Sequence, residues 1–125
     1  MSQLVSNEIY DEIALYNEDM ELDKIWGDIC NPKICSHLIN FNDRREAFLW
    51  VIKRLMEQGK IKLIGMKTDL PLEGTVKEQI ERFRQAFPNS DEEMEDGLWF
   101  FYDACPAGCD WKWRFSKKYG TQVSE

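Results

Sequence analysis

The sequence predicts an α+β fold, in which helices pack on one face of a small antiparallel sheet of about three strands. A single globular domain is expected over residues 1–125. Three observations support this prediction. Apolar residues recur at helical spacing through the first half of the chain, a helix-capping sequence begins at Thr75, and aromatic and polar residues alternate over 110–115. The length and a hydrophobic content of 43% are sufficient for one buried core.

Two helices are expected in the first 31 residues. Ser6 or Asn7 can cap the first, which would run to Asn17 and would turn Ile9, Ile13 and Tyr16 inward. The second is short and ends at Asn31-Pro32. Its expected inward side chains are Leu22, Ile25, Trp26 and Ile29.

The longest helix is predicted over residues 42–58, with Gly59 just past its end. Its apolar side is formed by Phe48, Val51, Ile52, Leu55 and Met56. Residues 60–64 alternate and predict a strand. Thr75 and Glu78 form a capping box that opens a further helix, which Pro88 closes. The inward residues of that helix are Val76, Ile80, Phe83 and Phe87.

The last third of the chain is rich in aromatic residues. Residues 98–102 form a continuous apolar run, which we expect to be helical and to end near Ala104. Residues 106–108 are expected to turn. A strand is then predicted over 109–115, with Trp111, Trp113 and Phe115 facing the helices, and a last strand over 119–123.

Acidic residues are concentrated in two segments. Residues 1–31 hold eight acidic side chains and one basic side chain, a net charge of −7 that equals the charge of the whole chain. A second acidic run covers 91–96. Such a field repels nucleic acid and anionic membranes and attracts basic proteins, although solubility alone also explains it. The expected partner-binding residues are Asp11, Glu12, Glu18, Asp19, Glu21, Asp23, Asp91, Glu92, Glu93 and Glu95.

No catalytic or metal-binding motif is recognisable. The chain has no glycine-rich phosphate loop, no nucleophile elbow, and no known arrangement around His37, its one histidine. We therefore expect no enzyme activity, no cofactor and no small-molecule substrate. The cysteines are paired as Cys30 with Cys35 and Cys105 with Cys109, and these spacings differ from the two intervening residues that are usual for zinc. No metal is expected.

Trp111, Trp113 and Phe115 also alternate with Lys112 and Arg114, a combination found in stacking platforms for single-stranded nucleic acid. Alternation on a strand places the rings on one face and the cations on the other, so core packing is the favoured interpretation. No apolar run is long enough to span a bilayer, and the acidic N-terminus is unlike a signal peptide. A cytoplasmic location with reduced cysteines is therefore expected.

Several motifs resemble a bacterial family catalogued as a domain of unknown function (number 596). They are residues 45–48 (Arg-Glu-Ala-Phe), 59–63 (Gly-Lys-Ile-Lys-Leu) and 83–88 (Phe-Arg-Gln-Ala-Phe-Pro), with the closing segments 99–103 (Trp-Phe-Phe-Tyr-Asp) and 105–108 (Cys-Pro-Ala-Gly). The resemblance covers residues 41–115. Cys109 departs from the family pattern, in which this position is usually aliphatic, and this departure weighs further against zinc. In the closing segments we expect fold determinants rather than contact residues at Trp99, Tyr102, Asp103, Cys105 and Pro106.

The resemblance implies a biological setting rather than a set of catalytic residues. Members of the family are often encoded near delivered toxins, which implies an immunity protein of a contact-dependent growth inhibition system. The implied partner is a cognate toxin with a basic surface, such as a nuclease, which the protein would occlude without catalysis. Two alternatives remain from the sequence: an interaction or regulatory domain unrelated to toxins, and an enzyme with a spatially assembled site.

Overall fold

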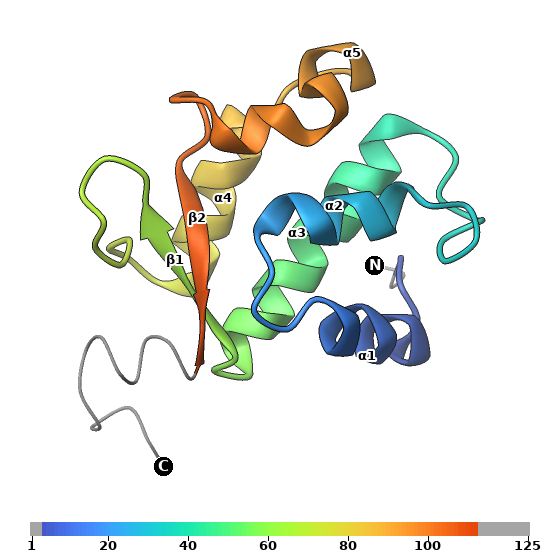
Figure 1. Cartoon of the computed structure of the whole chain (residues 1–125), viewed down its shortest axis with the longest axis horizontal. Coiled ribbons are helices and arrows are strands. Elements are labelled where there is room, and N and C mark those ends of the chain that lie inside the picture. The colour runs from blue at the N-terminus through green and yellow to red at the C-terminus, as the bar shows by residue number, and fades with distance from the viewer. Residues whose placement is uncertain (1–3, 113–125) are drawn as a thin grey trace.

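The computed structural model describes residues 4–112 and has the predicted α+β architecture (Figure 1). In chain order the elements are α1 (Asn7–Tyr16), α2 (Leu22–Cys30), α3 (Phe41–Glu57), β1 (Ile61–Gly65), α4 (Val76–Ala86), α5 (Asp91–Met94), the 3-10 helix η1 (Glu95–Phe101) and β2 (Ala107–Trp111). Within residues 4–112, no helix has the length and apolar character needed to cross a membrane.

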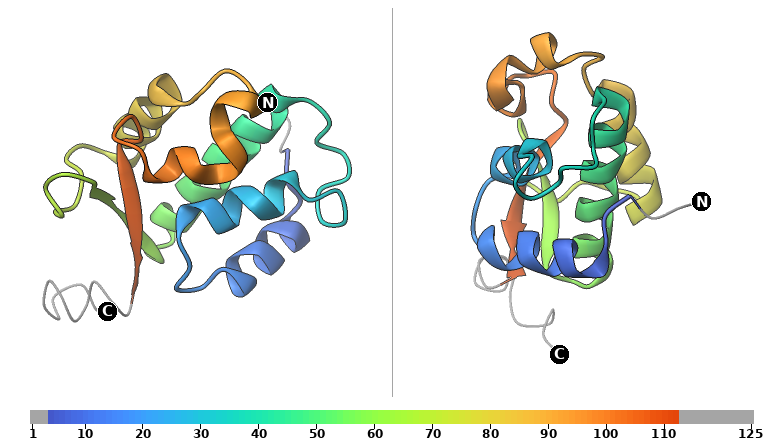
Figure 2. Two further views of the ribbon diagram at one scale, coloured as in Figure 1. Left: turned by 45° about the horizontal axis from the view of Figure 1, so that its top comes forward. Right: turned by 90° about the vertical axis from the view of Figure 1, so that its right-hand side faces the viewer.

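Helix α3 is the centre of the molecule. It packs against α2, α4 and β1. The turned views show α2, η1 and β2 together on the side of the molecule away from α4 (Figure 2). Because η1 also packs against α2, segments from the two ends of the described chain share one face.

The helix ends follow local sequence signals. Ser6 caps α1 by accepting a hydrogen bond from the Ile9 amide, and Thr75 forms the predicted capping box with Glu78 at the start of α4. Gly59 ends α3 with φ +73°, and the Lys60 amide donates to the Leu55 carbonyl at 2.9 Å. This left-handed ending is the role that glycine commonly has after a helix.

The sheet of the described chain has two antiparallel strands, in register at Leu63 and Cys109. Strand β2 begins at Ala107, so the turn expected over 106–108 is wrong: residues 107 and 108 pair with Gly65 and Ile64. Trp111 is buried, as predicted for the helix-facing side. Trp113, Phe115 and the strand expected over 119–123 lie outside the described residues.

Trp26 of α2 is the hub of the aromatic core. Its ring centroid lies 5.7 Å from that of Phe41, 5.9 Å from that of Phe48 and 5.4 Å from that of Phe87. These rings come from the start and the middle of α3 and from the residue that follows α4. All four expected inward residues of α2 are buried, so the periodicity predicts the buried side of this helix correctly.

In α1 the prediction of the buried side is partly wrong. Tyr16 is 63% exposed, whereas Tyr10 is fully buried and its hydroxyl donates to Gln58 at 2.7 Å. The buried line therefore runs through Tyr10, Ile13 and Ala14. Tyrosine suits either environment because its ring is apolar and its hydroxyl is polar, so the sequence pattern did not distinguish the two.

The segment that follows α5 is helical, as expected, but has 3-10 geometry and ends at Phe101. Among the expected fold determinants, Trp99 and Cys105 are buried. Tyr102 and Asp103 are exposed, and the Tyr102 hydroxyl donates to Glu95. Burial therefore supports a core role for Trp99 and Cys105 only.

Candidate protein-interaction surface

The acidic residues of α1 and α2 are mostly exposed, but they face two different grooves. Asp11 and Glu18 line a groove of about 700 Å³ between α1 and β2, where Lys60 and Lys112 form the opposite wall. We call this the α1–β2 groove. Among the residues of 4–112 that line it, two carboxylates and two ammonium groups balance, so this part of the surface has little net attraction for a basic partner.

The second groove has an unbalanced charge. It lies between the end of α1, the start of α2 and the start of η1, and has a volume of about 420 Å³. We call it the α2–η1 groove. Its lining residues are Tyr16, Asn17, Met20, Asp23, Lys24, Gly27, Asp28 and Asp96. Three carboxylates thus face one ammonium group, and among residues 4–112 no salt bridge joins any of the three to a cation.

Buried polar contacts hold the wall formed by α1 and α2. Asn17 is only 4% exposed, and its Nδ2 donates both to the Ile13 carbonyl at 2.9 Å and to Oδ2 of Asp28 at 2.7 Å. Asp23 is half-buried, and its Oδ1 is buried without a hydrogen-bond partner in the described part of the chain. A buried, unpaired carboxylate oxygen is costly, and such groups are rare in folded proteins.

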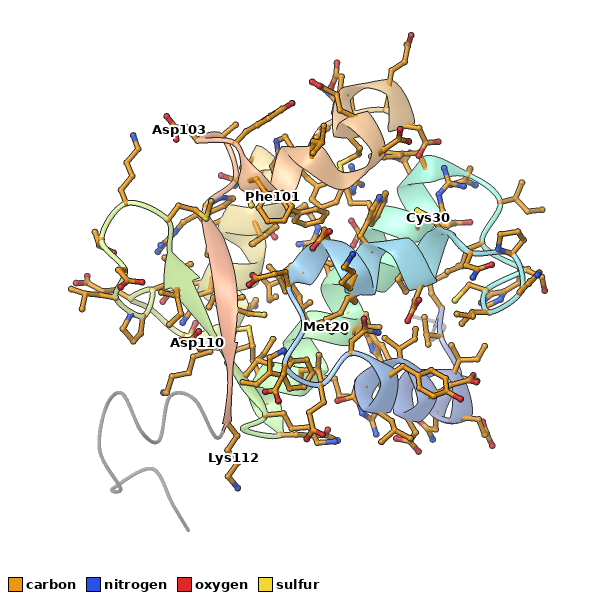
Figure 3. The ribbon with its side chains drawn as sticks, viewed as in Figure 1. Met20, Cys30, Phe101, Asp103, Asp110 and Lys112 are labelled. Carbon is orange, nitrogen blue, oxygen red and sulfur yellow. The ribbon has the colours of Figure 1, made fainter. Side chains whose placement is uncertain are left out.

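Two side chains of strand β2 hold the connection between α1 and α2 in place. Trp111 Nε1 donates to the Met20 carbonyl at 2.9 Å, and the Cys109 thiol donates to the same oxygen at 3.7 Å. Figure 3 labels Met20 at the connection between α1 and α2, and it labels Phe101 of η1 in the same view. The Met20 side chain itself is 45% exposed.

A left-handed turn brings the second acidic run to α2. Glu95, Asp96 and Gly97 have φ values of 50°, 57° and 92°. A Cβ added at Gly97 would lie 3.7 Å from Cβ of Asp23, which measures how closely η1 approaches α2. Asp and Gly tolerate this conformation better than most residues. The turn therefore places Asp96 beside a carboxylate 73 positions earlier in the chain.

Most of the other acidic residues of α5 and η1 have internal partners. Asp91 accepts from Arg44 of α3 at 2.5 Å, Glu93 accepts from the Asn89 amide at 2.9 Å, and Glu95 accepts from Tyr102. Glu92 is exposed. The Asp91 contact attaches α5 to α3, and the other two are local, so three of the four residues expected to bind a partner here already have an internal partner.

The remaining expected residues are placed as follows. Glu12 is exposed on α1, Asp19 and Glu21 are exposed in the connection before α2, and Asp23 is in the α2–η1 groove. The sequence did not single out Asp28 and Asp96 as binding residues, and the fold adds both to that groove. Asp96-Gly97 is a typical turn dipeptide, but a turn signal does not tell which helix the turn will contact.

Three of the four cysteine thiols lie in largely apolar surroundings. Burial raises the pKa of Cys30, Cys35 and Cys105 to about 11 each, because a thiolate is poorly solvated there. Within residues 4–112, no group of three or more His, Cys, Asp or Glu side chains could hold an ion. His37 contacts the Leu4 carbonyl through Nε2.

We expect the purified protein to contain less than about 0.1 zinc per chain, because the cysteine spacings differ from those of zinc sites and no three possible ligands lie together within residues 4–112. Elemental analysis after dialysis measures the metal content, and circular dichroism with and without a chelator tests whether metal supports the fold. One zinc per chain, lost together with the helical signal on chelation, would contradict the expectation.

The stacking platform for nucleic acid is not supported at Trp111. This residue is 3% exposed, and its indole N–H is used by Met20, so its ring is part of the core. Lys112 is exposed at the end of the described chain. Trp113, Arg114 and Phe115 lie outside the described residues.

Comparison with known proteins finds a family and a fold. The model of family DUF596, described as "Protein of unknown function", matches residues 56–122. An uncharacterised protein conserved in bacteria, from Neisseria meningitidis, has a solved structure that matches with a TM-score of 0.64 and 24% identity, over 83% of this chain and 77% of that one. At this identity the likeness shows a shared fold. No protein with curated information matches the chain.

Proposed function

The chain belongs to the DUF596 family of proteins of unknown function, and we propose that it acts as an immunity protein. In this proposal it binds a delivered protein toxin in the bacterial cytoplasm and occludes its active surface without catalysing a reaction. The α2–η1 groove is the observation that carries the binding role, because it joins three carboxylates with exposed apolar side chains on one face.

The physical properties of this face suit a basic protein partner. A net charge of −7 attracts a positively charged surface over distances of about a Debye length, which speeds association. The apolar side chains of Tyr16, Met20 and Phe101 are 63%, 45% and 53% exposed. Large apolar groups surrounded by charge are the usual composition of a binding site, since the apolar groups slow dissociation and the charges provide selectivity.

The choice of a toxin as partner follows from the setting that the sequence resemblance implies. Toxins that cleave nucleic acid need a cationic surface to hold their substrate. The positive charge that attracts the nucleic-acid substrate also attracts an acidic inhibitor. Once bound, the inhibitor covers this surface and excludes the substrate. The proposed mechanism is therefore steric and electrostatic occlusion at one inhibitor per toxin.

Co-expression with the toxin gene encoded beside this protein tests the proposal. We expect cells that carry both genes to survive toxin induction, and the two proteins to elute together at 1:1 stoichiometry in size-exclusion chromatography. A toxin with its active site inactivated can be produced and purified without this protein, and mixing the two purified proteins then tests complex formation independently of cell survival. If neither protection nor a complex is found, the immunity proposal is wrong, and an interaction domain unrelated to toxins takes its place.

A further inference from the structure

We infer that the α2–η1 groove is the receptor for an arginine side chain of the partner protein. This inference rests on the proposed function, because it identifies the chemistry by which the same face recognises a basic protein. The groove has the features that a guanidinium requires: carboxylates without cationic partners, an aromatic side chain beside them, and room for a long side chain.

The carboxylates of the groove favour the binding of a cation. Oδ1 of Asp23 is buried and accepts no hydrogen bond in the described part of the chain. The charge of a carboxylate is shared between its two oxygens, so a cation that reaches Asp23 from the groove compensates the unpaired oxygen as well. A guanidinium brings five N–H donors in one plane and keeps its charge at any physiological pH.

Asp28 and Asp96 add two further carboxylates to that of Asp23 and so increase the negative charge of the groove. Asp28 already accepts a hydrogen bond from Asn17, which holds it in place without neutralising it. Asp96 is exposed on the facing turn. Among the described residues that line the groove, Lys24 is the one basic side chain, and it is exposed. One more positive charge is therefore needed before this part of the groove approaches neutrality.

The apolar walls favour arginine over lysine. Tyr16 at 63% exposure offers a ring for a planar guanidinium to stack on, and Met20 at 45% exposure can cover the aliphatic part of an incoming side chain. An ammonium is more strongly hydrated, does not stack in this way, and cannot pair with two carboxylates through a fixed fork of donors.

The first experiment uses a probe of known structure, N-acetyl-arginine methylamide, titrated into the ¹⁵N-labelled protein. We expect saturable shifts of the backbone amides of Gly27, Asp28 and Gly97. The citrulline analogue has nearly the same shape without the charge and should cause none, and the lysine analogue should bind more weakly. Shifts spread over all acidic segments, or equal shifts in the double variant Asp23→Asn with Asp96→Asn, would overturn the inference.

The same double variant is then measured against the inactivated toxin. Asn is nearly isosteric with Asp and tolerates the left-handed conformation of position 96, so the fold should be retained. We expect the dissociation constant to rise roughly 30-fold or more, as for loss of a desolvated charge pair. The control variant Glu57→Gln with Glu73→Gln removes two exposed carboxylates outside the groove and should change affinity by no more than about twofold.

The outcomes separate this inference from the proposed function. If the toxin binds the Asp23/Asp96 variant as tightly as the original chain, the groove is not the receptor. The immunity proposal then holds with a different toxin-binding surface. If the arginine probe binds the groove but the toxin forms no complex, the immunity proposal fails, and the groove remains a site for a different basic protein. If neither binds, both are wrong.

Discussion

Replacing Trp26 with alanine is expected to lower the free energy of unfolding by about 3–5 kcal/mol. Trp26 is 5% exposed and its ring lies within 6 Å of the rings of Phe41, Phe48 and Phe87. Its removal leaves a cavity where α2, α3 and the end of α4 meet, and the rigid neighbouring rings cannot close it. Such a loss is a large part of the 5–15 kcal/mol that stabilises an ordinary domain.

Urea unfolding followed by far-ultraviolet circular dichroism measures this change without depending on tryptophan fluorescence. The matched control is Phe101→Ala, which removes an aromatic side chain that is 53% exposed on η1 and should cost about 1 kcal/mol or less. If Trp26→Ala costs no more than this control, the position of α2 against α3 is not as described. The variant should also weaken partner binding, because α2 carries Asp23 and Asp28 on its other side.

Reversing Glu18 and Glu21 to lysine is expected to slow association with the toxin by about tenfold or more at low ionic strength. Both residues are exposed in the connection between α1 and α2, which also supplies Asn17 and Met20 to the α2–η1 groove. Glu18 itself lines the α1–β2 groove, and neither residue has an ion pair within residues 4–112. Two reversals change the net charge from −7 to −3. Stopped-flow or surface-binding kinetics should show that the effect lies in the association rate and diminishes as salt is added, because salt screens exposed charges.

The control for this variant has the same charge change at Glu57 and Glu73, which lie outside both grooves. A purely global effect of net charge would slow association equally in both variants, and the proposed orientation of the complex would then be wrong. A different outcome concerns the second acidic run. If reversal of Glu92 slows association while reversal of Glu18 and Glu21 does not, the toxin faces α5 and immunity survives with another binding surface.

Local signals in the sequence account well for where elements begin and end. The capping box of Thr75 and Glu78, the Ser6 cap and the left-handed Gly59 each depend on atoms within a few residues, so their outcome does not require the rest of the fold. The failures occur where a competing long-range contact decides. Ala107 and Gly108 look like turn residues, but pairing with β1 makes them part of a strand.

The sequence determines how many charges the chain carries and in which segments. The tertiary structure decides which of these charges are neutralised by a neighbour and which stay available to a partner. Composition alone indicates an acidic protein with a preference for basic partners. Composition cannot show that Lys60 and Lys112 lie opposite Asp11 and Glu18 in one groove. Nor can it show that Arg44 forms an ion pair with Asp91. Those neutralisations join residues far apart in the chain, and only the packing of helices and strands brings them within reach.

What the sequence determined by itself is therefore the α+β class, the approximate boundaries of α1 to α4, the core positions of α2 and the acidic character of the surface. The tertiary structure decided that Asp23, Asp28 and Asp96 share a groove with Tyr16 and Met20. The physical reason is that periodicity reports which side of a helix avoids water, whereas a binding site depends on which helices become neighbours. Here the packing of Trp26 and the left-handed turn at Asp96-Gly97 make that choice.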